Sequence, residues 1–136
     1  MVPGSCCCGA VRFALAEPPT MMAQCHCSRC RKLGASVSVF TKAAHFRWTA
    51  GEALVARYTP EPPYRYTRAF CSRCGTALGE AGSAADSFPI NADTLDADPG
   101  VRIRFHEFVG ELPPWAAIGD DARRFDAHPV PNSEET

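Results

Sequence analysis

Eight cysteines in a chain of 136 residues constrain the fold most, because they fall into three tight clusters. The clusters are Cys6-Cys7-Cys8-Gly9, Cys25-His26-Cys27-Ser28-Arg29-Cys30 and Cys71-Ser72-Arg73-Cys74-Gly75. C-x-C and C-x-x-C spacings form short loops in which two thiolates can bind one metal ion. The alternative is a set of disulfides, but disulfide partners would not need to cluster in this way. The spacing therefore favours metal binding.

Seven of the cysteines divide into a group of four and a group of three. A closed structural zinc site has four ligands, whereas a catalytic zinc site has three protein ligands and one open position. The first and third clusters each end in glycine, which allows a tight turn around the metal. They supply the predicted structural zinc site, formed by Cys6, Cys8, Cys71 and Cys74. The middle cluster supplies a second, open zinc site formed by Cys25, Cys27 and Cys30, so we expect two zinc ions per chain.

Two residues inside the clusters are open to other interpretations. Cys7 points away from its neighbours if the C-x-C segment is extended, so we expect a packed or free thiol there. His26 would close the second site if it were a ligand, because Cys3His is an ordinary structural zinc set. Between two metal-facing cysteines, however, its side chain is expected to face outward, at the surface or in a polar contact.

Alternation of apolar and polar residues predicts strands at 11–15, 64–70 and 101–106. Shorter strands are expected at 37–40, 54–58 and 88–91, the last at a sheet edge because it contains Pro89. A short helix is expected at 28–33, capped by Ser28 and ended by Gly34. A second short helix is expected at 116–124. The pattern predicts a mostly β, antiparallel domain with little helix, stapled by zinc.

The predicted domain organisation is one zinc-binding β domain over residues 1–128 and a flexible polar tail over 129–136. Basic and acidic residues are balanced, with 14 Lys and Arg against 15 Asp and Glu. This balance argues against nucleic acid as a partner. No apolar run approaches the roughly 20 residues that cross a bilayer, and Met1 to Ser5 does not resemble a secretion signal. We expect a cytoplasmic protein without membrane association, where thiols stay reduced.

Four motifs together resemble the glutathione-dependent formaldehyde-activating enzyme family, which also contains centromere protein V. They are Ser5-Cys6-x-Cys8-Gly9-Ala10-Val11-Arg12-Phe13, Cys25-His26-Cys27-Ser28-x-Cys30-Arg31-Lys32-x-Gly34, Arg68-x-Phe70-Cys71-x-x-Cys74-Gly75-Thr76-x-Leu78 and Asn91-x-x-Thr94-Leu95-Asp96. The resemblance implies a β-tent fold with the same two zinc sites. It also implies reversible joining of formaldehyde and glutathione to give S-hydroxymethylglutathione, a carbon-sulfur lyase activity.

The chemistry of the second site agrees with this activity. Three thiolates and one zinc ion carry a net negative charge, so the site is a poor Lewis acid but can hold an incoming thiol as thiolate. A thiolate is the nucleophile that adds to an aldehyde and the leaving group in the reverse reaction. Cys25, Cys27 and Cys30 would act as ligands of this open catalytic zinc. Arg29, Arg31 and Lys32 are candidate binding residues for the carboxylates of glutathione or another small thiol.

Two other functions remain open at the level of sequence. The chain can be a non-catalytic, zinc-stabilised binding module, which a closed or empty second site would favour. It can also be a thiol redox or metal-handling protein that uses Cys7 and the clusters for exchange. No general base is identified, because His45, His106 and His128 are expected to be surface or structural residues.

Overall fold

Short strands dominate residues 1–129, the part of the chain that the computed structural model describes. The strands are β1 (Val2–Ser5), β2 (Arg12–Leu15), β3 (Met21–Cys25), β4 (Val37–Lys42), β5 (Phe46–Ala50), β6 (Val55–Tyr58), β7 (Arg68–Cys71), β8 (Ala77–Gly79), β9 (Ser87–Asn91), β10 (Ile103–Glu107) and β11 (Arg123–Arg124). The helical elements are α1 (Ser28–Leu33) and the 3-10 turns Ala43–His45, Glu52–Leu54, Ala92–Thr94 and Val109–Glu111. The predicted fold class, mostly β with little helix, is confirmed.

A three-stranded antiparallel sheet at the N-terminal end has the order β1-β2-β5. Alternation in β2 buries Phe13 and Leu15, as predicted, although Ala14 is buried as well. The Phe13 ring stacks on Phe46 at 5.4 Å between ring centroids, and Phe46 contacts Phe88 edge-on at 5.3 Å. These aromatic contacts join the sheet to β9 and form the centre of the hydrophobic core.

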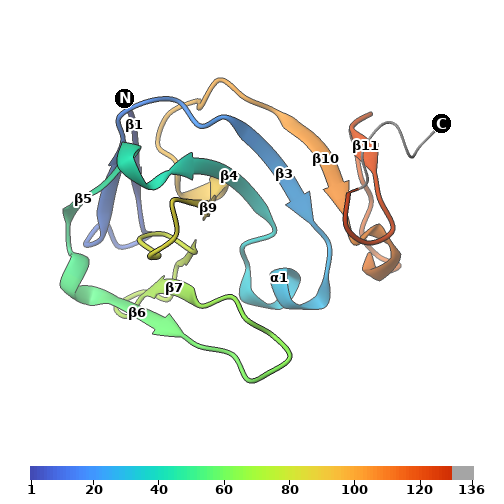
Figure 1. Cartoon of the computed structure of the whole chain (residues 1–136), viewed down its shortest axis with the longest axis horizontal. Helices are drawn as coiled ribbons and strands as arrows, with labels where there is room; N and C mark the ends of the chain where they lie inside the picture. The colour runs from blue at the N-terminus through green and yellow to red at the C-terminus, as the bar shows by residue number, and fades with distance from the viewer. Residues whose placement is uncertain (130–136) are drawn as a thin grey trace.

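The largest sheet has the order β11-β10-β3-β4-β9, with β9 at an edge as its proline predicts. Figure 1 shows it running across the molecule, with β10 and β11 at the end away from β1. The β3-β4 and β4-β9 pairs are antiparallel, whereas β10 runs parallel to both β3 and β11. A bulge between Ile103 and Phe105 leaves both residues half-buried, while His106 is fully buried. Of the two expectations for His106, a surface or a structural position, the structure shows the buried one.

The third sheet has the antiparallel order β6-β7-β8. It meets β9 at Gly79, where an added Cβ atom would lie 2.9 Å from backbone atoms of both Pro89 and Asn91. The Glu80 N–H donates to the Pro89 carbonyl oxygen at 2.9 Å. Glycine at this position allows two sheets to approach through their backbones alone.

Two sequence predictions for this region and the C-terminal part are wrong. The strand expected at 64–70 begins only at Arg68, because β6 ends opposite it at Tyr58 and the preceding segment has no strand to pair with. The helix expected at 116–124 does not form. Its Asp120 carboxylate accepts a hydrogen bond from the Ala122 N–H at 2.9 Å, an interaction that competes with helical hydrogen bonding.

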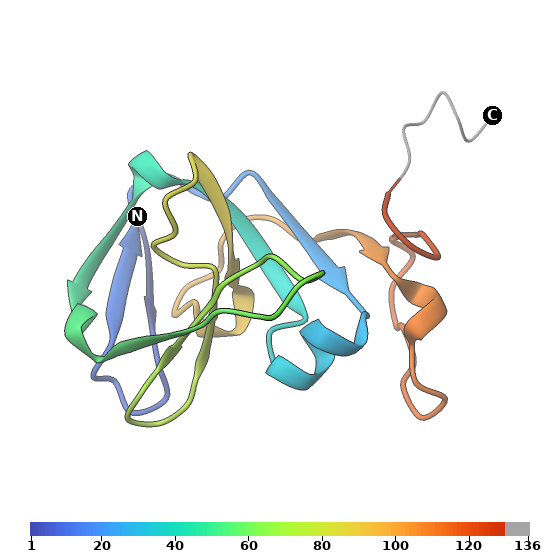
Figure 2. The ribbon, with the colours of Figure 1, turned by 60° about the horizontal axis from the view of Figure 1, so that its bottom comes forward.

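Helix α1 spans residues 28–33, as predicted, and ends at Gly34 in the left-handed conformation (φ 80°). Its N-cap is Cys27 rather than the expected Ser28: the Cys27 sulfur accepts a hydrogen bond from the Cys30 N–H at 3.3 Å. Figure 2 shows the segment between β6 and β7 extending beside this helix. A candidate metal ligand thus also begins the only α-helix among residues 1–129.

Among residues 1–129, no helix is both long and apolar enough to cross a bilayer. The predicted tail lies outside the described residues apart from Pro129, which is exposed.

Candidate metal centre and its surroundings

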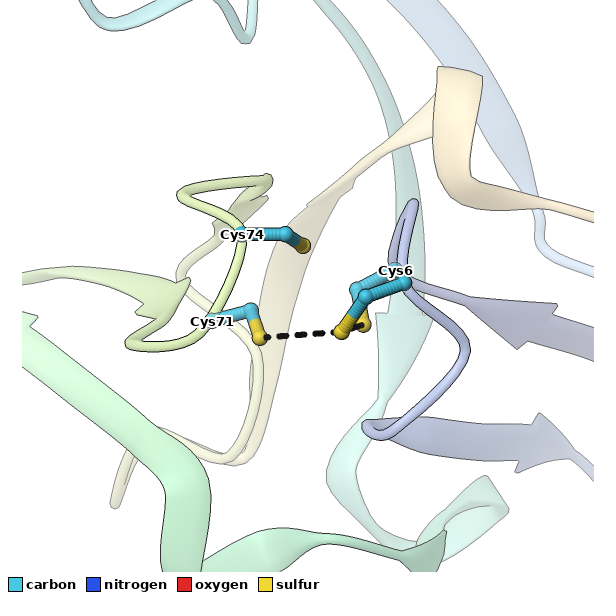
Figure 3. Close-up of side chains that lie close together, drawn as sticks. Cys6, Cys71 and Cys74 are labelled. Atoms are coloured by element: carbon cyan, nitrogen blue, oxygen red, sulfur yellow. Dashed lines mark hydrogen bonds between the residues drawn. The ribbon is translucent and has the colours of Figure 1, made fainter.

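Four cysteine sulfur atoms from two distant turns lie within 4.8 Å of one another. Cys6 and Cys8 come from the turn between β1 and β2, Cys71 ends β7, and Cys74 lies in the turn between β7 and β8. Figure 3 shows the labelled side chains of Cys6, Cys71 and Cys74 converging across the space between these turns. The structure therefore brings together the four residues predicted for the structural zinc site, which we call the four-sulfur group.

The distances within the four-sulfur group suit a metal better than a disulfide. Sulfur atoms around a tetrahedral zinc, at about 2.3 Å from the ion, lie about 3.8 Å apart. The Cys6 and Cys8 sulfurs are 3.6 Å apart, and the Cys8 and Cys71 sulfurs are 4.0 Å apart. A disulfide needs about 2.0 Å, and all eight cysteines are free thiols. The donor set and its spacing fit zinc.

Local backbone geometry explains how each pair closes on one point. Gly9 and Gly75 adopt positive φ angles of 77° and 81°. Their N–H groups donate to the carbonyl oxygens of Cys6 and Cys71, which closes both turns. The Val11 N–H also donates to the Cys6 sulfur at 3.3 Å, an interaction that favours a thiolate. Both turns are tight, as the two glycines predict.

Three more sulfur atoms, from Cys25, Cys27 and Cys30, form a second group within 4.8 Å. This three-sulfur group is local: Cys25 ends β3, Cys27 caps α1 and Cys30 lies in its first turns. Cys25 and Cys27 are half-buried and Cys30 is more deeply buried. His26 is not a member of the group.

Arg68 is a residue of this site that the sequence did not predict. Its guanidinium lies 3.7 Å from the Cys30 sulfur, at the start of β7. Hydrogen bonds from Cys25 and Arg68 lower the pKa of Cys30 to about 5. A positive charge beside three thiolates offsets their net negative charge. The sequence feature that could have identified Arg68 is its position three residues before Cys71, within the Arg68-x-Phe70-Cys71 motif.

The three basic residues proposed for substrate binding do not converge on one point. The Arg29 guanidinium lies 3.8 Å from the centre of the Tyr64 ring and donates to the Tyr58 hydroxyl at 3.2 Å. Arg31 and Lys32 line two separate cavities. Arg29 is therefore engaged with aromatic side chains, whereas the other two remain beside open space.

Two cavities lie beside α1: one is lined by Cys25 of the three-sulfur group, and the other by Arg68, which contacts Cys30. The cavity that we call the Cys25 cavity has a volume of about 220 Å³ and is lined by Cys25, His26, Arg31 and Trp115, among others. The cavity that we call the Arg68 cavity has a volume of about 180 Å³ and is lined by Lys32, Tyr58 and Arg68, among others. Each contains a basic residue, so an anionic group could be neutralised on either side.

His26 is buried rather than at the surface, and it makes the polar contact that was the other expectation for it. Its Nε2 atom lies 2.8 Å from Nδ1 of His106, and its backbone N–H donates to the Glu107 carbonyl oxygen. Nε2 of His106 lies 2.9 Å from a carboxylate oxygen of Asp120. The hydrogen bond from His106 lowers the pKa of Asp120. The sequence did not reveal this hydrogen-bonded chain, because His26, His106 and Asp120 lie on separate elements.

Cys7 lies outside both sulfur groups and is exposed. Its backbone N–H donates to the Thr76 hydroxyl at 3.0 Å. The residue thus helps join the two turns of the four-sulfur group through its backbone, while its thiol remains free.

The fold and these groups define a small β protein with two cysteine clusters suited to metal ions. Residues 1–111 match the family described as "Glutathione-dependent formaldehyde-activating enzyme", and the chain belongs to this family. Its activity is therefore of the family's type, glutathione chemistry related to formaldehyde.

A protein of Rhodobacter sphaeroides with a known crystal structure is similar, with 26% sequence identity and a TM-score of 0.57. The alignment covers 82% of this chain and 97% of that one. No curated protein matches the chain.

Proposed function

We propose that this protein is a zinc-dependent carbon-sulfur lyase that forms and cleaves a thiol adduct of a small aldehyde, such as S-hydroxymethylglutathione. The observation that carries the proposal is a group of three sulfurs, rather than four, with Cys25 at the wall of a cavity of about 220 Å³. Catalytic zinc sites have three protein ligands, and their open position accepts the reacting group. The proposal includes two zinc ions per chain.

The two sulfur groups have different roles in this proposal. Cys6, Cys8, Cys71 and Cys74 hold a structural ion, because they tie together turns that are distant in the sequence. Cys25, Cys27 and Cys30 hold the second ion, which when bound would keep an incoming thiol deprotonated. Arg68 offsets the negative charge of these three cysteines through its contact with Cys30. The whole site lies in one domain, residues 1–128, followed by the polar tail.

The reaction requires no oxidant or reductant. In the forward direction the thiol sulfur forms a bond to the aldehyde carbon, and the thiol proton ends on the aldehyde oxygen as a hydroxyl. In the reverse direction the carbon-sulfur bond breaks and the hydroxyl proton returns to the thiol. Arg31 is the best placed of the predicted basic residues for a substrate carboxylate, because it lines the same cavity as Cys25. Lys32 would serve a substrate in the Arg68 cavity.

A cytoplasmic location is part of the proposal, because eight free thiols and a soluble thiol substrate both suit a reducing compartment.

The test is Cys27→Ser with Cys7→Ser as its matched control. We expect Cys27→Ser to remain folded, to contain one zinc ion fewer, and to lose acceleration of adduct formation between glutathione and carbon-13 formaldehyde, followed by exchange NMR. Cys7→Ser should retain both zinc and activity, because Cys7 belongs to neither sulfur group. Full acceleration by Cys27→Ser would contradict the lyase. No acceleration by the wild type, with both ions bound, would favour the non-catalytic binding module.

A further inference from the structure

Three side chains from separate segments form a continuous hydrogen-bonded chain that leads to the three-sulfur group. Asp120 comes from a loop, His106 from β10, and His26 from the connection between β3 and α1. The nitrogen of His106 and the oxygen of Asp120 are 2.9 Å apart, and the facing nitrogens of His106 and His26 are 2.8 Å apart. The His106 side chain is 1% exposed, whereas that of Asp120 is 43% exposed. The hydrogen-bonded chain therefore runs from Asp120 at the solvent, through the buried ring of His106, to His26. His26 lies between two candidate ligands in the sequence.

This geometry determines the position of each proton. The Asp120 carboxylate is an acceptor, so His106 must donate from Nε2. With both rings uncharged, His106 then has an unprotonated Nδ1 that accepts. The facing nitrogen of His26, Nε2, must then be the donor. It follows that the remaining nitrogen of His26, Nδ1, carries a lone pair.

The lone pair on His26 has no partner among the hydrogen bonds of residues 1–129, although His26 is a buried residue. A buried acceptor without a partner is unfavourable unless a water or ligand satisfies it. His26 lines the Cys25 cavity together with Arg31 and Trp115. The cavity is thus lined by a candidate metal ligand, by a residue with a guanidinium, and by the residue that carries this acceptor.

We propose that Nδ1 of His26 accepts a hydrogen bond from the hydroxyl group of the bound adduct, and that His106 and Asp120 are positioning residues that hold His26 in the accepting tautomer. The choice of ligand rests on the proposed function, in which every adduct of a thiol and an aldehyde carries such a hydroxyl. The tautomer of His26 does not depend on the proposed function. Arg31 cannot replace His26 in this role, because a guanidinium has no acceptor.

The first test reads the tautomers in the free, zinc-loaded protein. In a sample with nitrogen-15 histidine, long-range nitrogen-proton NMR spectra distinguish protonated from unprotonated ring nitrogens. We expect protons on Nε2 of both His26 and His106, with Nδ1 of His26 unprotonated. A proton on Nδ1 of His26 would overturn the proposal, whatever the enzyme catalyses.

The second test measures discrimination between two stable ligands, S-(2-hydroxyethyl)glutathione and S-propylglutathione. We expect the wild type to bind the hydroxylated ligand about 5-fold more tightly, which corresponds to one hydrogen bond of about 1 kcal/mol. His26→Phe should lose this preference. Asp120→Ala, which leaves every cysteine in place, should reduce it while zinc content stays unchanged.

Each outcome of the second test decides a separate point. Retention of the preference in both variants would overturn the role of His26. Substitution of a residue that only supports the fold would leave the ratio of the two affinities unchanged. Failure of both ligands to bind the wild type would overturn the proposed ligand and the glutathione-adduct function together. The tautomers from the first test would still decide whether His26 is an acceptor.

Discussion

At the residue scale, Cys7 and Cys71 show that the same side chain has opposite importance in different surroundings. Cys71 is fully buried, pairs with β6 through its backbone and places its sulfur 4.0 Å from that of Cys8. Cys7, between two candidate ligands, is exposed and contributes only a backbone hydrogen bond. Replacement of sulfur by oxygen should therefore affect the two positions very differently.

We predict that Cys71→Ser strongly lowers thermal stability. Binding of structural zinc contributes about 10–16 kcal/mol to folding in small zinc domains, so loss of one ligand removes a large part of the stability. Cys7→Ser, the matched control, should change the free energy of unfolding by less than about 0.5 kcal/mol. Thermal unfolding followed by circular dichroism measures both. Equal melting temperatures for the two variants would show that the four-sulfur group is not a metal site.

At the element scale, the contact between β8 and β9 joins two sheets and brings the β7–β8 turn into place. Gly79 is central to it, because φ is 70° and an added Cβ would meet backbone atoms of β9 at 2.9 Å. Backbone atoms cannot rotate away as a flexible side chain can. Gly100 has a similar φ of 80°, but open space surrounds its Cβ position. Substitutions at Gly79 and Gly100 therefore separate the cost of the left-handed conformation from the cost of contact with β9.

We predict that Gly79→Ala destabilises the protein by at least about 2 kcal/mol more than Gly100→Ala. Both variants force alanine into the left-handed region, which costs about 1–2 kcal/mol. Only the first also forces β9 away from β8. Urea unfolding monitored by tryptophan fluorescence gives the two free energies. If both variants lose the same stability, the two sheets can separate at this point without cost.

At the scale of the whole molecule, the two sulfur groups differ in what they connect. The four-sulfur group joins the β1–β2 turn to the β7–β8 turn, so it closes a loop through the first half of the chain. The three-sulfur group lies within six consecutive residues, 25–30, and closes almost no loop. Long loops lose more entropy on closure, so a metal at the first group contributes more to folding.

Metal removal should therefore occur in two separable stages. A mild chelator, or glutathione in excess, should remove or perturb the ion at Cys25, Cys27 and Cys30 while the melting temperature changes little. A strong chelator should then remove the ion of the four-sulfur group and unfold the protein. Zinc analysis alongside thermal unfolding measures both stages. Unfolding that coincides with loss of the ion at Cys25, Cys27 and Cys30 would contradict this assignment of structural and open sites.

The sequence by itself determined the features that depend on neighbouring residues. The grouping of seven cysteines follows from the C-x-C and C-x-x-C spacings together with Gly9 and Gly75, and the structure shows the same two groups. The extent of α1 follows from the stop at Gly34. Where a segment depends on a partner, local pattern was not enough: residues 64–67 alternate like a strand, but no strand lies opposite them.

Only the tertiary structure decided what surrounds the three-sulfur group. Arg68 reaches Cys30 because β7 packs near α1, and His26 is buried because β10 runs parallel to β3 and places His106 against it. Asp120 completes that chain instead of entering a helix. Such contacts join residues far apart in the sequence, and their energies depend on distance and burial that arise only when the sheets assemble.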